Sequence, residues 1–419
     1  MAQVLTALSP ERVAQLKRQA CDRVDALAAE LVALADDIHA NPELGFQEVR
    51  TVAKVQELLS KHGLASQTGR AGLATGLRAE LGAPASGHPG RPKVAIIAEY
   101  DALPGLGHAC GHNTICTSAL GAALAIQSLV GQTLGSAVLL GTPAEESAVD
   151  NAGGKIHMLR GGDFDDVDVA MMVHPNDRDD LGQEGSLAAR GVDFEFHGRP
   201  AHAAAAPHLG INALDAVIQT YNAINALRQH VRPDVRIHGI ITHGGDAPNI
   251  VPKYAACRFR IRAADLPYLE ELSEKVINCA RGAALATGAR LEHRDFAPTY
   301  ENQLPNSVLA ELAGANFQQL GRTMESKRLR GGMGSTDFGN VSRRVPALCP
   351  YVQIAEPGTK PHTVEFERAA GSAMAHRMIL DSAKALAMTA IDLLARPELV
   401  ERARAELVDR LSAEKERRD

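Results

Sequence analysis

The chain has 419 residues, 45% of them hydrophobic and 22% charged, which are the proportions of a globular protein and not of a disordered or fibrous one. Its net charge of -6 arises from interspersed acidic and basic residues, so a nucleic-acid partner is not expected. Six cysteines without framework spacing predict free thiols and a cytoplasmic location. Neither a signal peptide nor a membrane span is predicted. A chain of this length is expected to form two domains.

A long helix is predicted over Ser9–Ile38, because Ser9 is a suitable N-cap, Pro10 suits the first turn, and apolar residues recur every three or four positions. A second helix is expected around Val49–His62. Apolar strands and a helix then alternate: Lys93–Ala98, Thr114–Val130 (the helix), Ala137–Leu140 and Val167–Val173. This alternation predicts an α/β domain whose mostly parallel sheet carries helices on both faces.

The pattern changes at about Leu187. The next elements follow the order β-α-β-β-α-β of a ferredoxin-like fold: Ala189–Phe196, Asn212–His230, Val235–Thr242, Tyr254–Arg262, Pro267–Ala286 and Arg290–Phe296. From about Tyr300 the first pattern resumes, with a glycine-rich loop at Gly331–Gly334 and a strand at Tyr351–Ile354. We therefore expect a catalytic domain of residues 1–187 and 300–419, and an inserted domain of residues 188–299.

The stretch from Glu99 to His112 follows a buried strand and precedes a helix, which is where open α/β sheets carry their sites. Cys110 and His112 flank a glycine, so an extended loop would project both side chains to one side. A thiolate and an imidazole are ligands that zinc-like metals prefer. Taken alone, however, a Cys-x-His sequence in a loop is usually not a site.

Three further strand ends carry polar side chains. Glu145 and Glu146 follow the strand at Ala137–Leu140, His174 follows Val173, and His362 lies in the loop beyond Tyr351–Ile354. Each has an ordinary alternative, such as a solvated acidic turn or a hydrogen-bonded histidine. Together with the Cys-x-His sequence they supply ligands for two divalent ions. The mixture of thiolate, imidazole and carboxylate favours manganese or zinc over magnesium or calcium.

At this point the chain resembles a known family. The motifs Asp101-Ala-Leu-Pro, His108-Ala-Cys-Gly-His112, Pro143-Ala-Glu-Glu146 and His174-Pro175, with the late His362, are similar to those of the aminoacylase and carboxypeptidase-type dinuclear metallopeptidases, amidohydrolase branch. The resemblance covers roughly residues 27–394. Four further runs are most like the p-aminobenzoyl-glutamate hydrolase and β-alanyl-dipeptidase group: Gly153–Lys155, His238–Ile241, Pro248–Pro252 and Gly334–Ser342.

The resemblance implies a site and a mechanism. Two divalent ions per protomer would be held by five ligands: Cys110, His112, Glu146, His174 and His362. Glu145 would act as general base for a hydroxide shared by the two ions, and Asp101 would orient a ligand imidazole. The inserted domain would be a lid and would form a homodimer. In it His202 would reach the partner's site, and Asn249 and Arg262 would bind substrate oxygens.

These features predict a metal-dependent amidohydrolase that cleaves a C–N bond of a small molecule, an N-acyl or N-aroyl amino acid or a dipeptide. Asn113, Cys349 and His208 differ from the residues common in that branch, so a hydrolytic deaminase acting on an aryl amine or amidine stays open as an alternative. A second alternative is a non-catalytic metal-binding assembly protein. The presence of Glu145 beside the ligands argues against it, because a scaffold has no chemical need for a base.

Overall fold

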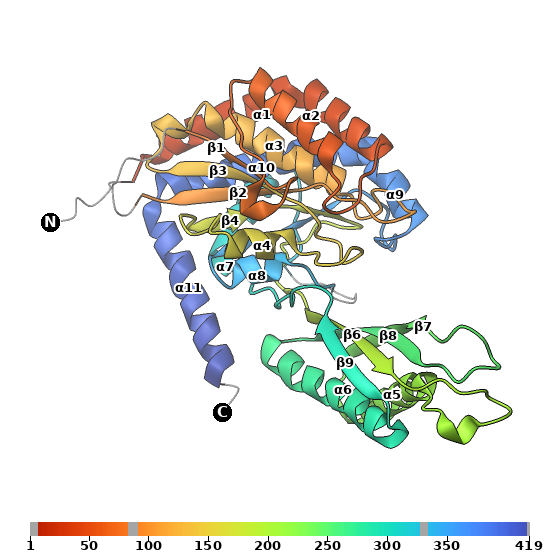
Figure 1. Cartoon of the computed structure of the whole chain (residues 1–419). Helices are drawn as coiled ribbons and strands as arrows, with labels where there is room; N and C mark the ends of the chain where they lie inside the picture. Colours follow the sequence, from red (N-terminus) through yellow and green to blue (C-terminus); the bar gives the residue numbers. More distant parts are fainter. Residues whose placement is uncertain (1–6, 83–90, 327–333, 417–419) are drawn as a thin grey trace. The chain divides into compact units, whose positions relative to one another are not determined.

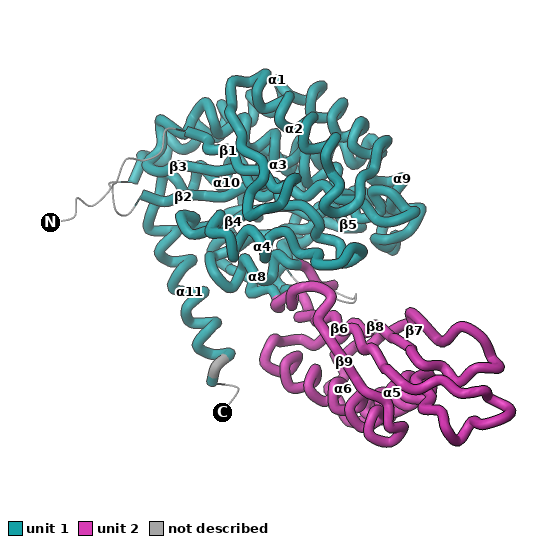
Figure 2. Tube along the Cα trace, viewed as in Figure 1, with its two compact units in different colours: residues 1–185, 303–332, 337–419 teal, residues 186–302, 333–336 magenta. Residues whose placement is uncertain are grey.

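The computed structural model describes residues 7–82, 91–326 and 334–416. The chain forms two compact units (Figure 2). Unit 1 takes in residues 1–185, 303–332 and 337–419, and unit 2 takes in residues 186–302 and 333–336, as far as these are described. The predicted glycine-rich loop at 331–334 lies outside the described residues except for Gly334.

Within its described residues, unit 1 is built on a five-stranded sheet of order β1-β3-β2-β4-β10, of which Figure 1 labels β1 to β4. The strands are β1 (Leu77–Glu80), β2 (Lys93–Glu99), β3 (Ser136–Thr142), β4 (Val169–Met171) and β10 (Ala347–Leu348). All neighbouring pairs are parallel except β1 and β3, which run antiparallel. The predicted α/β class with a mostly parallel sheet is therefore confirmed.

Helices cover both faces of this sheet. Alternate residues of β2 point to opposite sides, so Val94 and Ile96 join one hydrophobic core while Ala95 and Ile97 join another. The first core is covered by α1 (Pro10–Ala40), α2 (Val49–Lys61), α3 (His112–Gln127) and α10 (Ala373–Ala395), and the second by α4 (Gly154–Arg160) and α8 (Phe338–Ser342). The remaining helices of unit 1 are α7 (Ser307–Gln319), α9 (Val364–Ala370) and α11 (Pro397–Glu416). Burial on both faces explains why the strands read as unbroken apolar runs.

The strand predicted over Val167–Val173 is wrong in its extent. β4 ends at Met171, and the chain forms a separate strand, β5 (His174–Asn176), which pairs in parallel with β11 (Tyr351–Gln353). Pro175 and Pro350 lack the N–H that a continuous ladder would need at these positions, so one sheet gives way to another. His174 consequently opens the second strand and does not end the first.

Unit 2 contains a four-stranded antiparallel sheet of order β7-β8-β6-β9 among its described residues. Its elements in chain order are β6 (Ala188–His197), α5 (Ala213–Leu227), β7 (Arg236–His243), β8 (Tyr254–Ala263), α6 (Leu266–Thr287) and β9 (Arg290–Asp295). Both helices pack on one face of the sheet, against a core that includes Phe194, Phe196 and Phe259. The predicted ferredoxin-like order is confirmed.

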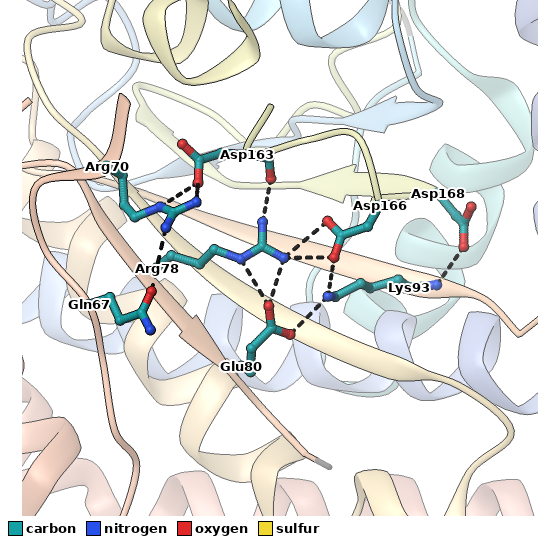
Figure 3. A network of polar contacts seen from close by, with 8 residues as sticks. All are labelled: Gln67, Arg70, Arg78, Glu80, Lys93, Asp163, Asp166 and Asp168. Carbon is teal, nitrogen blue, oxygen red and sulfur yellow. Dashed lines mark hydrogen bonds and ion pairs between the residues drawn. The ribbon is translucent and has the colours of Figure 1, made fainter. Parts of the chain in front are cut away.

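A network of ion pairs surrounds Lys93, the first residue of β2 (Figure 3). The Lys93 ammonium lies 2.9 Å from Glu80 and 2.5 Å from Asp166, and Arg78 contacts the same two carboxylates. Because β2 is about 20 Å long, this network is remote from the carboxyl end of the strand. Among the described helices, none is long and apolar enough to cross a membrane.

Helix α4 lies close against the segment that follows β3. A Cβ atom at Gly154 would lie 1.9 Å from the carbonyl oxygen of Pro143, so only glycine fits at this position without a shift of the backbone. The N–H of Gly153 donates to the carbonyl of Ala144 at 2.7 Å. The start of α4 therefore supports the residues that immediately precede Glu145.

We predict that Gly154→Ala lowers the stability of the protein by about 1–3 kcal/mol, because the added methyl group forces α4 away from Pro143. Thermal unfolding measures the effect. Gly282→Ala is the matched control: Gly282 lies inside α6, and apart from the nearby backbone of that helix the added Cβ would meet no atom within 4 Å, so this change should stabilise the protein by up to about 1 kcal/mol. Equal unfolding midpoints for the two variants would contradict the prediction.

Candidate metal centre

The carboxyl ends of β2, β3 and β4 lie at one edge of the sheet because these strands are parallel. The loops after β2 and β3, the strand β5 and the loop after β11 bring donor atoms within 4.8 Å of one another, and two of the groups are Cys110 with His112 and His174, and Cys110 with Glu146 and His362. The two groups share the Cys110 sulfur. A thiolate, imidazoles and a carboxylate in this arrangement fit two neighbouring divalent ions of the zinc or manganese type.

His112 is oriented by Asp101. The Nδ1 atom of His112 lies 3.0 Å from Oδ1 of Asp101, whose Oδ2 accepts the N–H of Glu146 at 2.9 Å. Burial opposes the ionisation of Asp101, but His112 and the N–H of Glu146 outweigh it and hold the pKa of this carboxyl below its usual range. The Nε2 atom of His112 is buried without a hydrogen-bond partner among the described residues, as expected of a nitrogen that faces a cation.

His174 is oriented by its own backbone. Its Nδ1 atom lies 2.8 Å from the carbonyl oxygen of Pro175, which can only accept, so Nδ1 carries the proton and Nε2 has a free lone pair. This Nε2 atom lies 3.5 Å from the sulfur of Cys110. Burial lowers the pKa of His174 to about 4, and the ring is therefore neutral at pH 7, the state in which imidazole binds a metal.

The Cys-x-His turn differs from the expected extended loop. Gly111 has φ 75°, a left-handed conformation, and a Cβ atom there would lie 2.6 Å from Pro175. Cys110 and His112 do approach each other, but through a tight turn that requires glycine. Burial, and secondly Glu146, raises the pKa of the Cys110 thiol well above its usual range, so a nearby cation is needed to keep it as a thiolate.

His362 belongs to a strained segment. Its φ is 64°, uncommon for a residue with a side chain, and its N–H donates to the carbonyl of Ala109 at 2.9 Å. The Nε2 atom lies 3.2 Å from Oε1 of Glu146. The His362 side chain is 51% exposed, whereas Cys110 and His112 are buried. This loop therefore forms the open side of the centre.

Glu145 follows a second strained residue, Ala144, with φ 52°. A fully buried carboxylate, Glu48, holds this turn: its Oε1 accepts the N–H of Ala144 at 2.9 Å and its Oε2 accepts the Thr75 hydroxyl at 2.8 Å. Burial raises the pKa of Glu145 well above its usual range, and Glu146 and other carboxylates nearby act in the same direction. A raised pKa makes Glu145 a better proton acceptor.

Sequence reasoning missed three charged residues beside this centre. Glu99, Lys155 and Asp337 are buried, and oxygen atoms of Glu99, Glu145 and Asp337 lie within 4.8 Å of one another. Glu99 could have been noticed as a charge that ends an apolar strand. Lys155 and Asp337 lie in the runs Gly153–Lys155 and Gly334–Ser342 that carry the family resemblance, but nothing in those runs indicates that either charge is buried, because burial depends on the folded chain.

The other predicted site residues lie in unit 2. The loops of His202 and Asn249 pair with each other, since the N–H of Ala203 donates to the carbonyl of Asn249 at 3.0 Å. The Nδ1 atom of His202 accepts hydrogen bonds from the N–H groups of Ala204 and Ala205, and the residue is exposed. Arg262 lies on β8, pairs with no described carboxylate, and has its pKa lowered by burial.

A buried site of this composition on an α/β sheet, in a chain with an inserted four-stranded domain, is typical of a metal-dependent hydrolase. Residues 185–287 match the peptidase dimerisation domain of the M20 family. The chain is 39% identical to the Xaa-Arg dipeptidase of Mus musculus, covering 95% of this chain and 94% of the relative. It is 28% identical to one of the p-aminobenzoyl-glutamate hydrolase subunits of Escherichia coli, covering 91% and 92%.

Solved structures show the same fold. A putative aminohydrolase from Staphylococcus aureus aligns with a TM-score of 0.71 at 20% identity, covering 90% of this chain and all of that one. A dinuclear metal-binding M20 peptidase from Bacillus subtilis aligns with a TM-score of 0.62 at 23% identity, covering 88% and 99%. The chain belongs to the M20 family of metal-dependent peptidases and amidohydrolases.

Glu48 yields a prediction about pH. Burial, and secondly Asp101, raises its pKa from 4.5 to about 7. A carboxyl whose pKa is raised by folding stabilises the protein most below pH 4.5, and this contribution is lost as pH rises toward 7. Glu48→Gln cannot ionise, so its stability relative to the natural chain should increase between pH 5 and pH 8, by up to about 3 kcal/mol. Unfolding at both pH values measures this, and a pH-independent difference would contradict it.

Proposed function

We propose that the chain is a dinuclear metallodipeptidase that hydrolyses the peptide bond of small substrates. The observation that carries the proposal is the pair of ligand groups that share Cys110, with Glu145 beside them. One ion would be held by Cys110, His112 and His174, and the other by Cys110, Glu146 and His362. When bound, the two ions supply a nucleophilic water at neutral pH and polarise the substrate carbonyl.

The protein's own residues move the proton and orient the ligands. Glu145 accepts a proton from the attacking water and returns it to the leaving nitrogen, so the same carboxyl serves as base and then as acid. Asp101 holds the proton-bearing Nδ1 of His112, which keeps Nε2 directed at the ion. The side chains of Asp101 and Glu145 are buried, so bulk water is excluded from these contacts.

Unit 2 supplies groups for the substrate. We assign His202 to the developing oxyanion, and Asn249 and Arg262 to substrate carbonyl or carboxylate oxygens. A partly buried guanidinium without a described carboxylate partner supports an anion-binding role for Arg262. The edge strand β7 exposes Ile240 (62%) and Ile241 (47%), which supports pairing with a second copy of the chain.

The relatives guide the choice of substrate. Because the chain is 39% identical to an Xaa-Arg dipeptidase over nearly its full length, dipeptides with a basic C-terminal residue are the first substrates we propose. N-aroyl glutamates come second, on the more distant similarity to a p-aminobenzoyl-glutamate hydrolase. All six cysteines are free in the structure, which supports action in a reducing cytoplasm.

Turnover of Xaa-Arg dipeptides, β-alanyl dipeptides, aminobenzoyl-glutamate and aryl amines by chain loaded with manganese or zinc tests the proposal. We expect amide hydrolysis, and we expect Glu145→Gln to lower kcat by about 10²- to 10⁴-fold, the usual contribution of a positioned base. Elemental analysis should find two divalent ions per chain in both proteins. Turnover near the natural level in a metal-replete Glu145→Gln protein would overturn the mechanism, and release of ammonia from aryl amines alone would favour a deaminase.

We further predict that His202 acts in the partner's site. Inactive His202→Ala protein mixed with inactive Glu145→Gln protein should regain part of its activity when protomers exchange, because each heterodimer has one site with both residues intact. If His202 acted within its own chain, every site would lack one residue. A mass tag verifies exchange. Exchange without any recovery of activity would rule out the arrangement in trans and leave the metal chemistry unaffected.

A further inference from the structure

Lys155 is a buried cation that the mechanism above does not use. Its side chain is fully buried, and its ammonium lies 2.5 Å from Oε1 of Glu99 and 2.6 Å from Oδ1 of Asp337. Both carboxylates are also buried, with side chains 1% and 0% exposed. A side chain with no exposed surface does not touch a substrate, so any effect of Lys155 on turnover must pass through its neighbours.

One of those neighbours is the proposed base. Oxygen atoms of Glu99, Glu145 and Asp337 lie within 4.8 Å of one another, and three carboxylates at such distances repel strongly in a buried environment. Glu145 lies beside both His112 and Glu146, while Glu99 also approaches His112, with its Oε2 3.6 Å from Nε2. The Lys155 ammonium offsets this repulsion at the point where the carboxylates converge, and thereby allows Glu145 to stay close to the centre.

The backbone couples Lys155 to the same segment. The N–H of Lys155 donates to Oδ2 of Asp337 at 2.9 Å, so Asp337 binds both the amide and the ammonium of one residue. Two residues earlier, Gly153 donates to the carbonyl of Ala144, the residue before Glu145. Lys155 is thus fixed by its side chain and its backbone relative to the turn that carries Glu145.

We propose that Lys155, held by Asp337, is a positioning residue for Glu145: it fixes the Glu145 carboxylate where it accepts the proton. This inference rests on the proposed role of Glu145 as general base. It assigns a function to two sequence runs, Gly153–Lys155 and Gly334–Ser342, that the metal centre leaves without one.

The test is a double-mutant cycle on the metal-loaded protein. Lys155→Met keeps the length of the side chain and removes its charge, so kcat should fall by roughly 10- to 100-fold as Glu145 is displaced, while KM changes by less than about threefold. In the Glu145→Gln background the same change should lower kcat by less than about twofold, because the group through which Lys155 acts is already disabled. Thermal unfolding and metal content are measured for every variant.

Lys93→Met is the matched control, because the Lys93 ammonium also pairs with two carboxylates, those of Glu80 and Asp166 (Figure 3). Lys93 lies on the same strand as Glu99, β2, but at its opposite end. Its kcat should stay within about twofold of the natural chain. If Lys155→Met does not fold or bind metal, Lys155→Met with Asp337→Asn removes one charge of each sign and takes its place in the cycle.

The outcomes separate the two hypotheses. An equal fall in kcat with and without Glu145, or no fall at all, overturns the role of Lys155 and leaves the proposed function standing. Natural turnover in Glu145→Gln alone overturns the proposed function, and the inference with it. A large fall that disappears in the Glu145→Gln background supports both.

Discussion

The structure of unit 1 depends on how negative charge is buried at one edge of its sheet. Five carboxyl groups and one thiol gather there with little exposed surface: Glu99, Asp101, Cys110, Glu145, Glu146 and Asp337. Burying ionised groups is costly unless each is paired or hydrogen-bonded. Within the protein, the Lys155 ammonium pairs with Asp337, and two backbone N–H groups donate to Asp101 and Asp337. Two divalent ions would offset most of the remaining negative charge, which is why the centre is chemically suited to hold them.

The precision of the centre comes from backbone turns that ordinary residues avoid. Ala144 and His362 have positive φ angles, and the backbone N–H of each donates a hydrogen bond to a distant residue. The acceptor is the Glu48 carboxyl for Ala144 and the Ala109 carbonyl for His362. Strain of this kind persists only where surrounding contacts impose it. Here those contacts come from Glu48, which precedes α2, from Ala109, which precedes α3, and from Gly153, which precedes α4 and donates to the carbonyl of Ala144. Segments far apart in the chain therefore determine where Glu145 and His362 stand.

The two units carry different kinds of proposed functional groups. Unit 1 carries the five proposed metal ligands, whereas unit 2 carries the groups that we assign to a substrate or to a second copy of the chain. Its sheet has one face covered by α5 and α6, and an edge strand, β7, with exposed isoleucines. A dipeptide has a carbonyl and a carboxylate to be recognised in addition to the bond that is cleaved. Arg262 and Asn249 are of the right chemical type for these groups.

The amino-acid sequence by itself determined the fold class, the two patterns of elements, and the stretches that carry the candidate donors, because apolar periodicity and motif residues are local properties. It did not place the break between β4 and β5, because the missing N–H groups of Pro175 and Pro350 matter only once it is known that β10 and β11 pair with β4 and β5. Nor could it reveal the cluster of Glu99, Lys155 and Asp337. Lys155 and Asp337 are 182 positions apart, and a charged residue reads as a surface residue until the folded chain buries it. Only the tertiary structure brings these charges together, because only there does the cost of burying each one depend on the others.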